Sequence, residues 1–140
     1  FGGDIEGVIA LGDSELETFV TSLDEALAGE LLRIRVEQAL PNFRRGSRHN
    51  ALTQFLLFGF LDARAGLYPA VDMIDAGLEV FTRVKPLEEW TSPSEFWDLV
   101  KWTAAAARQM PDERVNQSRE TGLALVQPGV KAWLRAVSNV

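Results

Sequence analysis

With 140 residues, of which 46% are hydrophobic, the chain is long enough and apolar enough to bury one core without covalent staples. It contains no cysteine and one histidine, which excludes disulfides, thiolate nucleophiles and any metal site that needs two histidines. Its net charge of −6 argues against bulk binding of nucleic acid.

We expect an irregular arm over residues 1–12, which contain four glycines around a short apolar patch. The arm could dock on its own domain as an extended segment, or on a neighbouring molecule. Its apolar side chains are therefore candidate interface residues: Val8, Ile9 and Leu11. Residues 13–140 are expected to form one helical domain.

Capping signals and a proline delimit the first predicted helices. Ser14 with Glu17 has capping-box spacing and predicts a helix that starts near Ser14. The same spacing recurs eight residues later and predicts a second helix, which Pro41 ends. One long helix with a kink at Gly29 is the alternative.

The next helix is predicted over about residues 50–65 and is apolar on nearly every side. Its large apolar side chains are Leu52, Phe55, Leu56, Phe58, Phe60 and Leu61. A helix of this kind belongs in the middle of a bundle. We therefore expect Phe58→Ala to cost on the order of 3–5 kcal/mol of stability.

Four further helices are predicted, each starting at or near a proline. They cover residues 69–84, 92–110 and 111–126, and a segment from Pro128 onward. The first of these has an inward stripe of Val71, Ile74, Leu78 and Phe81. The second has the strongest start signal, an N-cap at Ser92 followed by proline and a glutamate at N3.

The predicted fold is therefore all-α: a compact single-domain bundle of six or seven short helices packed around the central helix. No strand alternation and no internal repeat competes with this interpretation. All six prolines are expected at element boundaries, which makes the assignment consistent.

Charge is segregated along the chain. Residues 1–30 hold eight acids and no basic residue, whereas residues 31–50 hold five arginines and one glutamate. A negative segment followed by a positive one favours docking to a complementary surface, including that of a second copy. The alternative for the acidic segment is a helix face in contact with water alone.

The basic segment is the candidate site for an anion or an acidic partner. Guanidinium groups near a helix N-terminus suit phosphate and carboxylate ligands. The alternative is a solvated loop whose arginines pair with the acidic helices before it. The candidate residues are Arg33, Arg35, Arg44, Arg45, Arg48 and His49.

Arg44 and His49 also have the Arg-x4-His spacing of a class of small helical ribonucleases, in which the histidine acts as acid or base. Such pairs are common by chance, and nothing else in the chain supports that chemistry. We therefore predict no catalytic residue. An RNA- or phosphate-binding protein, including a ribonuclease, stays as an alternative function.

Three acids of one predicted helix, Asp72, Asp75 and Glu79, share a face. Carboxylates can hold Mg²⁺ or Ca²⁺, but helical metal sites draw their acids from several helices. Glu79 and Arg83 have the spacing of an ordinary ion pair. We expect a solvated face here, with no metal and no cofactor.

Four tryptophans in 140 residues are a high share. Trp97 and Trp102 lie five residues apart on one predicted helix, about 140° around its axis, so they cannot both face the core. Exposed tryptophan with charged neighbours is typical of binding hot spots, so Trp90 and Trp97 are candidate interface residues. Burial in the core is the alternative.

No apolar run reaches the roughly 18 residues that a membrane span requires. The chain begins with Phe1 rather than methionine, so we expect a fragment or a processed product, and the sequence does not tell whether a targeting segment or another domain precedes it. We expect a cytoplasmic protein without membrane association.

The predicted function is a non-enzymatic protein–protein interaction domain, such as an adaptor, a regulator, a toxin-neutralising protein or an assembly subunit. Its partner would be another protein, or a second copy in a homo-oligomer. A third interpretation is a helical bundle that binds an apolar small ligand beneath Phe55, Phe58 and Trp102.

Overall fold

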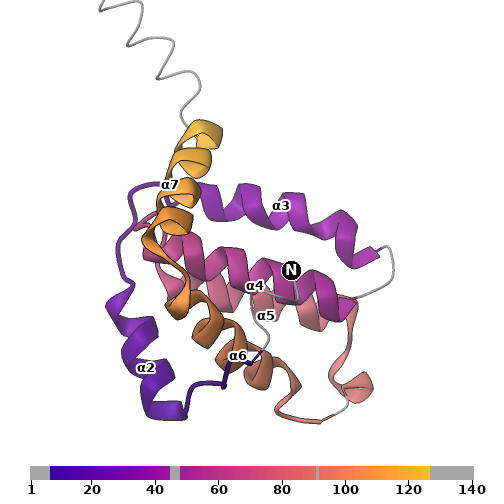
Figure 1. Ribbon diagram of the computed structural model, residues 1–140. Helices are drawn as coiled ribbons and strands as arrows, with labels where there is room; N and C mark the ends of the chain where they lie inside the picture. Colours follow the sequence, from indigo (N-terminus) through magenta and orange to yellow (C-terminus); the bar gives the residue numbers. More distant parts are fainter. Residues whose placement is uncertain (1–6, 45–47, 91, 127–140) are drawn as a thin grey trace, which may run out of the picture.

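The computed structural model describes residues 7–44, 48–90 and 92–126 (Figure 1). These residues contain no strand, and the predicted all-α class is confirmed. The predicted helix from Pro128 onward lies outside the described residues. The described helices are α2 (Asp13–Ser22), α3 (Leu31–Arg44), α4 (Arg48–Arg64), α5 (Ala70–Val84), α6 (Glu95–Gln109) and α7 (Asp112–Val126), with a short 3₁₀ turn η1 (Leu87–Glu89).

Helix α4 is the centre of the bundle, as predicted, and α3, α5, α6 and α7 all pack against it (Figure 1). Every residue from Ala51 to Ala63 is buried except Gln54 and Phe58. Phe58 is 41% exposed, so the expectation that it belongs to the core is wrong. Gln54 and Phe58 are one helical turn apart, and they lie on the one face of α4 that its neighbours leave open.

Small residues allow the helices to approach one another closely. A Cβ atom built on Gly59 of α4 would lie 2.6 Å from Cγ and Sδ of Met73 in α5. The four alanines 104–107 of α6 are all buried, and Arg64 donates hydrogen bonds of 2.7 and 2.8 Å to the carbonyls of Ala107 and Met110. This contact ties the end of α4 to the end of α6.

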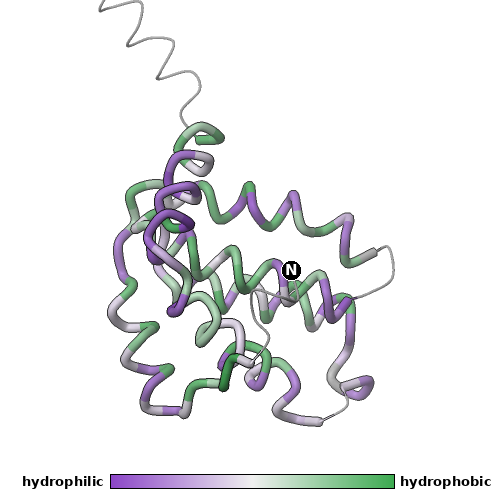
Figure 2. Tube along the Cα trace, in the orientation of Figure 1, coloured by the Kyte–Doolittle hydropathy of each residue, from purple (hydrophilic) through white to green (hydrophobic). Residues whose placement is uncertain are grey.

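Helix α7 is the most polar wall of the bundle (Figure 2). It buries Val115 and Gly122, and the latter lies where α7 approaches the core. A Cβ atom on Gly122 would lie 2.6 Å from Cδ1 of Leu67 and 2.8 Å from Cδ2 of Leu31. The position of α7 therefore depends on this glycine.

Helix α2 starts one residue before the prediction and has a different cap. Gly12 is the N-cap, and its amide donates to Oε1 of Glu15 at 3.4 Å. The predicted Ser14–Glu17 box is wrong because Ser14 lies inside the helix. Upstream, Leu11 is buried and its amide donates to the carbonyl of Lys101 at 3.2 Å, so this end of the arm docks on its own domain.

Both expectations for the segment before α3 are wrong. Residues 23–30 form neither a helix that starts near Ser22 nor part of one long helix, because their backbone is bonded to the segment after α4. Leu27 and Ala28 donate to the carbonyls of Gly66 and Leu67 at 3.0 and 2.9 Å. Long-range hydrogen bonds have here prevailed over local capping signals.

Pro41 does not end α3, contrary to the prediction, but lies within its last turn. An exposed proline near a helix end forfeits only one backbone hydrogen bond, and the helix runs on to Arg44. The expectation that all six prolines lie at element boundaries is therefore wrong for Pro41.

The start of α6 is also later than predicted. Ser94 rather than Ser92 is its N-cap, and the Ser94 hydroxyl donates to Asp98 at 2.9 Å. Helices α5 and α7 match the predicted ranges closely. Val71 of α5 is 49% exposed, however, so its predicted inward position is wrong. In the described residues, no helix combines the length and apolar character needed to cross a membrane.

Candidate functional site

The described arginines of the predicted anion site, Arg33, Arg35 and Arg48, do not gather on one open surface. Arg33 pairs with Glu37 on the exposed side of α3, at 2.9 Å. Arg48 donates to the carbonyl of Val84 at 2.7 Å and lies 3.9 Å from Glu89. Both arginines bond within the chain, but their acidic partners are not among residues 1–30, the acidic segment.

His49 takes no part in these contacts. His49 is exposed, and its backbone carbonyl accepts a hydrogen bond from Thr53. The Arg44 side chain and Arg45 lie outside the described part of the chain. The described residues therefore give no geometry for the predicted Arg44–His49 pair.

Arg35 instead belongs to a buried polar cluster, which we call the Arg35–Asp62–Tyr68 triad. Its Nε and Nη2 donate to the two carboxylate oxygens of Asp62 at 3.0 and 3.4 Å. The Tyr68 hydroxyl donates to Asp62 Oδ2 at 2.7 Å. Asp62 is 1% exposed. The triad joins α3, α4 and the segment that follows α4.

Asp62 and Tyr68 are not among the site residues predicted from the sequence. The sequence does contain one indication of Asp62, because this residue is the lone acid of the apolar helix α4. A buried carboxylate is costly unless it is paired, so a partner had to exist. Arg35 is 27 residues away in sequence, and nothing in the spacing identifies it.

Burial governs the protonation of this triad. It raises the pKa of Asp62, and the Arg35 charge and the Tyr68 hydrogen bond oppose part of that rise. Burial and the neighbouring carboxylate raise the pKa of Tyr68 well above its usual 10.0. The tyrosine therefore stays protonated at neutral pH and acts as a donor.

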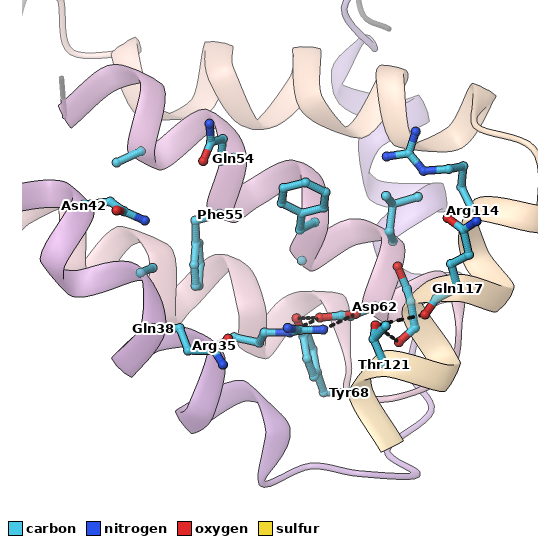
Figure 3. Close-up of a pocket in the computed structure, with 16 residues that line it drawn as sticks. Arg35, Gln38, Asn42, Gln54, Phe55, Asp62, Tyr68, Arg114, Gln117 and Thr121 are labelled. Atoms are coloured by element: carbon cyan, nitrogen blue, oxygen red, sulfur yellow. Dashed lines mark hydrogen bonds and ion pairs between the residues drawn. The ribbon is translucent and has the colours of Figure 1, made fainter. Parts of the chain in front are cut away.

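The triad lines a pocket of about 420 Å³ between α3, α4 and α7, which we call the Arg35 pocket (Figure 3). Figure 3 shows Phe55 between the triad and the amides of Asn42 and Gln54, with side chains of α7 on the opposite side. Phe58 also lines it, as the third interpretation expected, but Trp102 does not. The walls are more polar than that interpretation assumed.

A second hollow, of about 450 Å³, lies between α2, α5 and α6, and we call it the Trp97 groove. Its apolar lining includes Val71 and Trp97, which are 49% and 41% exposed. Trp97 stands edge-on to the buried ring of Phe96, with 5.2 Å between ring centroids. The full lining is Leu16, Val20, Val71, Ile74 and Trp97, with Asp13, Glu17, Asp75 and Lys101.

The acids of the Trp97 groove differ in their surroundings. Lys101 pairs with Asp13, and this contact lowers the pKa of Asp13. Within the described residues, Glu17 and Asp75 form no ion pair. The groove therefore combines an apolar floor with two carboxylates that form no ion pair within the described residues.

The other candidate interface residues are spread over the molecule. Ile9 is 83% exposed, Val8 is half-buried and Leu11 is buried. Trp90 is half-buried and donates from its indole to the carbonyl of Lys85 at 2.9 Å. Of these residues, only Trp97 lines one of the two cavities.

The acids of α5 do not converge on a metal site. Among the described residues, no three or more His, Asp or Glu side chains are grouped so that they could hold a metal ion. Glu79 pairs with Arg83 one turn later, as its spacing predicted. Asp75 contributes instead to the Trp97 groove.

Comparison with models of protein families, with curated proteins and with solved structures found no match for this chain.

Proposed function

We propose that this protein is a non-enzymatic interaction domain that binds a basic amphipathic segment of a partner protein in the Trp97 groove. The observation that carries the proposal is that Trp97 and Val71, both large apolar side chains and both substantially exposed, line the same hollow. Contiguous exposed apolar surface is typical of sites that another protein covers.

The apolar floor of the groove suits a bound segment, α-helical or extended, that carries apolar anchor residues. Tryptophan is enriched among the residues that dominate interface energetics, because it buries a large area at little entropic cost. Leu16 of α2 and Ile74 of α5 extend the floor on either side. An amphipathic helix presents anchors at three- and four-residue spacing to grooves of this kind.

The charges of the groove favour a basic partner. Three carboxylates and one lysine line it, which gives a net charge of −2. Carboxylates at the edge of an apolar groove attract lysine and arginine and set the orientation of the bound segment. The whole chain, at −6, adds to this attraction at long range.

Binding is favoured over catalysis because the single histidine of the chain is not part of either cavity. The alternative partner is a second copy of this chain, whose basic segment would bind in the groove and form a homo-oligomer. Arg33 on α3 is exposed and would be accessible to such a contact.

The test uses two synthetic amphipathic peptides with identical leucines, one with lysines and the other with glutamates on the polar face. Binding of each labelled peptide is measured by fluorescence anisotropy, and its location by ¹H–¹⁵N spectra. We expect the lysine peptide to bind and to shift resonances of α2, α5 and α6. Trp97→Ala should weaken binding by about thirtyfold or more.

Matched controls separate this groove from general stickiness. Leu27→Ala removes an exposed apolar side chain outside the groove, and should leave binding unchanged. Glu17→Lys with Asp75→Lys should abolish binding, whereas Glu30→Lys with Glu113→Lys makes the same charge change elsewhere and should weaken it only slightly. Equal binding of both peptides, or equal effects of both charge reversals, would contradict the proposal. Light scattering of the free protein tests the second-copy alternative.

A further inference from the structure

We infer that the Arg35 pocket is a binding site for a small organic acid with an aromatic or aliphatic body. This site shares no residue with the Trp97 groove, so it stands independently of the proposed function. The pocket is lined from α3, α4 and α7, whereas the groove is lined from α2, α5 and α6. Figure 1 shows the arrangement of these helices.

The triad supplies a cation that is held in place. Asp62 accepts from Nε and Nη2 of Arg35, and no hydrogen bond of Nη1 occurs within the described residues. The Arg35 side chain keeps 24% of its surface exposed, and it lines the pocket. A guanidinium fixed by one carboxylate can donate to a second from its remaining edge.

Positively charged side chains predominate among the described lining residues of the pocket. Arg35 and Arg114 line it together with the single carboxylate of Asp62, in a protein of net charge −6. Arg114 comes from α7 and Arg35 from α3, so two helices bring cations to one cavity. A buried or partly enclosed positive site favours an anionic ligand group.

The rest of the lining suits an apolar body. Phe55 and Phe58 of α4 both contribute to the wall, and Phe58 is 41% exposed. A volume of about 420 Å³ lies within the range of small-molecule sites. Aromatic walls with a few convergent polar groups are the usual composition of such sites.

Carboxamides complete the polar rim. They come from three helices, and within the described residues their side chains form no hydrogen bond to protein groups. They are thus open to a ligand, unlike the hydroxyl of Thr121, which donates to carbonyls of its own helix. The carboxamides are Gln38, Asn42, Gln54 and Gln117.

The experiment compares naphthalene-2-carboxylate with the uncharged naphthalene-2-carboxamide, each titrated into the ¹⁵N-labelled full chain. We expect the acid to shift resonances of the pocket residues in α3, α4 and α7, and the amide to bind about tenfold more weakly. Arg114→Gln should remove most of this preference. Arg33→Gln, on α3 but outside the pocket, should leave both affinities unchanged.

Arg35→Gln should abolish the preference for the acid, provided that its spectrum retains the native dispersion. Since this variant leaves Asp62 without its guanidinium and can unfold, the decisive comparison is that of Arg114→Gln with Arg33→Gln. Equal affinity for acid and amide, shifts confined to the Trp97 groove, or no binding of either compound would each overturn the inference.

Discussion

The Arg35 pocket and the Trp97 groove have nearly the same volume, about 420 and 450 Å³, and opposite chemistry. The described lining of the pocket has two arginines, one carboxylate and neutral amides, whereas that of the groove has an exposed tryptophan, three carboxylates and one lysine. Size therefore does not distinguish the two sites. The two sites differ in the surface that a bound ligand would cover. In the pocket this surface is a cation and two phenylalanine rings, and in the groove it is apolar surface with acids at its edge.

The largest effect is expected within α4, where the core and the pocket wall alternate. Phe60 is fully buried and Phe58 is 41% exposed. Phe60→Ala should cost about 3–5 kcal/mol, because truncation leaves a cavity in a packed core. Phe58→Ala should cost under about 2 kcal/mol, since half-exposed side chains lose less transfer free energy. Urea unfolding measures both, and equal costs would show that the pocket face of α4 is not open.

Asp62→Asn tests what burial does to the pocket's carboxylate. The pKa of Asp62 is raised above 3.8 in the folded protein. Between pH 3.8 and the raised pKa, the folded protein therefore holds a proton on this carboxylate that the unfolded chain has released. The stability contributed by this group is thus greatest at low pH and falls as pH rises from 3.8 through the raised pKa. We expect the substitution to cost about 1–3 kcal/mol and to cost more near pH 4 than near pH 7.

The control for this measurement is Asp72→Asn, which changes an exposed carboxylate of α5. Its cost should be small at both pH values. If the cost of Asp62→Asn instead grew with pH, attraction to Arg35 would outweigh desolvation.

Gly122→Ala would move the wall that α7 contributes to the Arg35 pocket. The added Cβ would lie within 2.8 Å of two buried leucine methyl groups, and 3.9 Å from Nη2 of Arg35. We expect a loss of about 1–3 kcal/mol from overpacking, partly offset by the better helix propensity of alanine. In ¹H–¹⁵N spectra the changes should concentrate around the pocket and spare the Trp97 groove. Changes centred on α2 would mean that the two sites are coupled.

The smallest effect is expected at the surface of the groove. Trp97→Ala should lower stability by no more than about 1.5 kcal/mol, since its main described ring contact is the edge-on one with Phe96. Its large effect should appear in peptide binding, which separates an interaction residue from a core residue. Thermal unfolding with Trp102→Ala as the comparison checks this point, because Trp102 is the less exposed of the two. A stability loss for Trp97 as large as that for Trp102 would contradict the interface role.

Local patterns determined the helices and the identity of the central one. The apolar run around Phe55 and Phe60 placed α4 in the middle, because a helix with no polar face can only be buried on most of its surface. The spacing of Trp97 and Trp102 required them to differ in exposure, and they do. Both conclusions depend on helical periodicity, which a single sequence displays.

Tertiary structure alone decided the segment 23–30 and the triad. The capping signals before α3 were overruled by backbone hydrogen bonds to Gly66 and Leu67, which lie far along the chain. Asp62 required a partner, but only the packing of α3 on α4 selected Arg35. The same packing left one face of α4 open and so exposed Phe58. Contacts between residues distant in sequence carry no local periodic signal, and both candidate sites are built from such contacts.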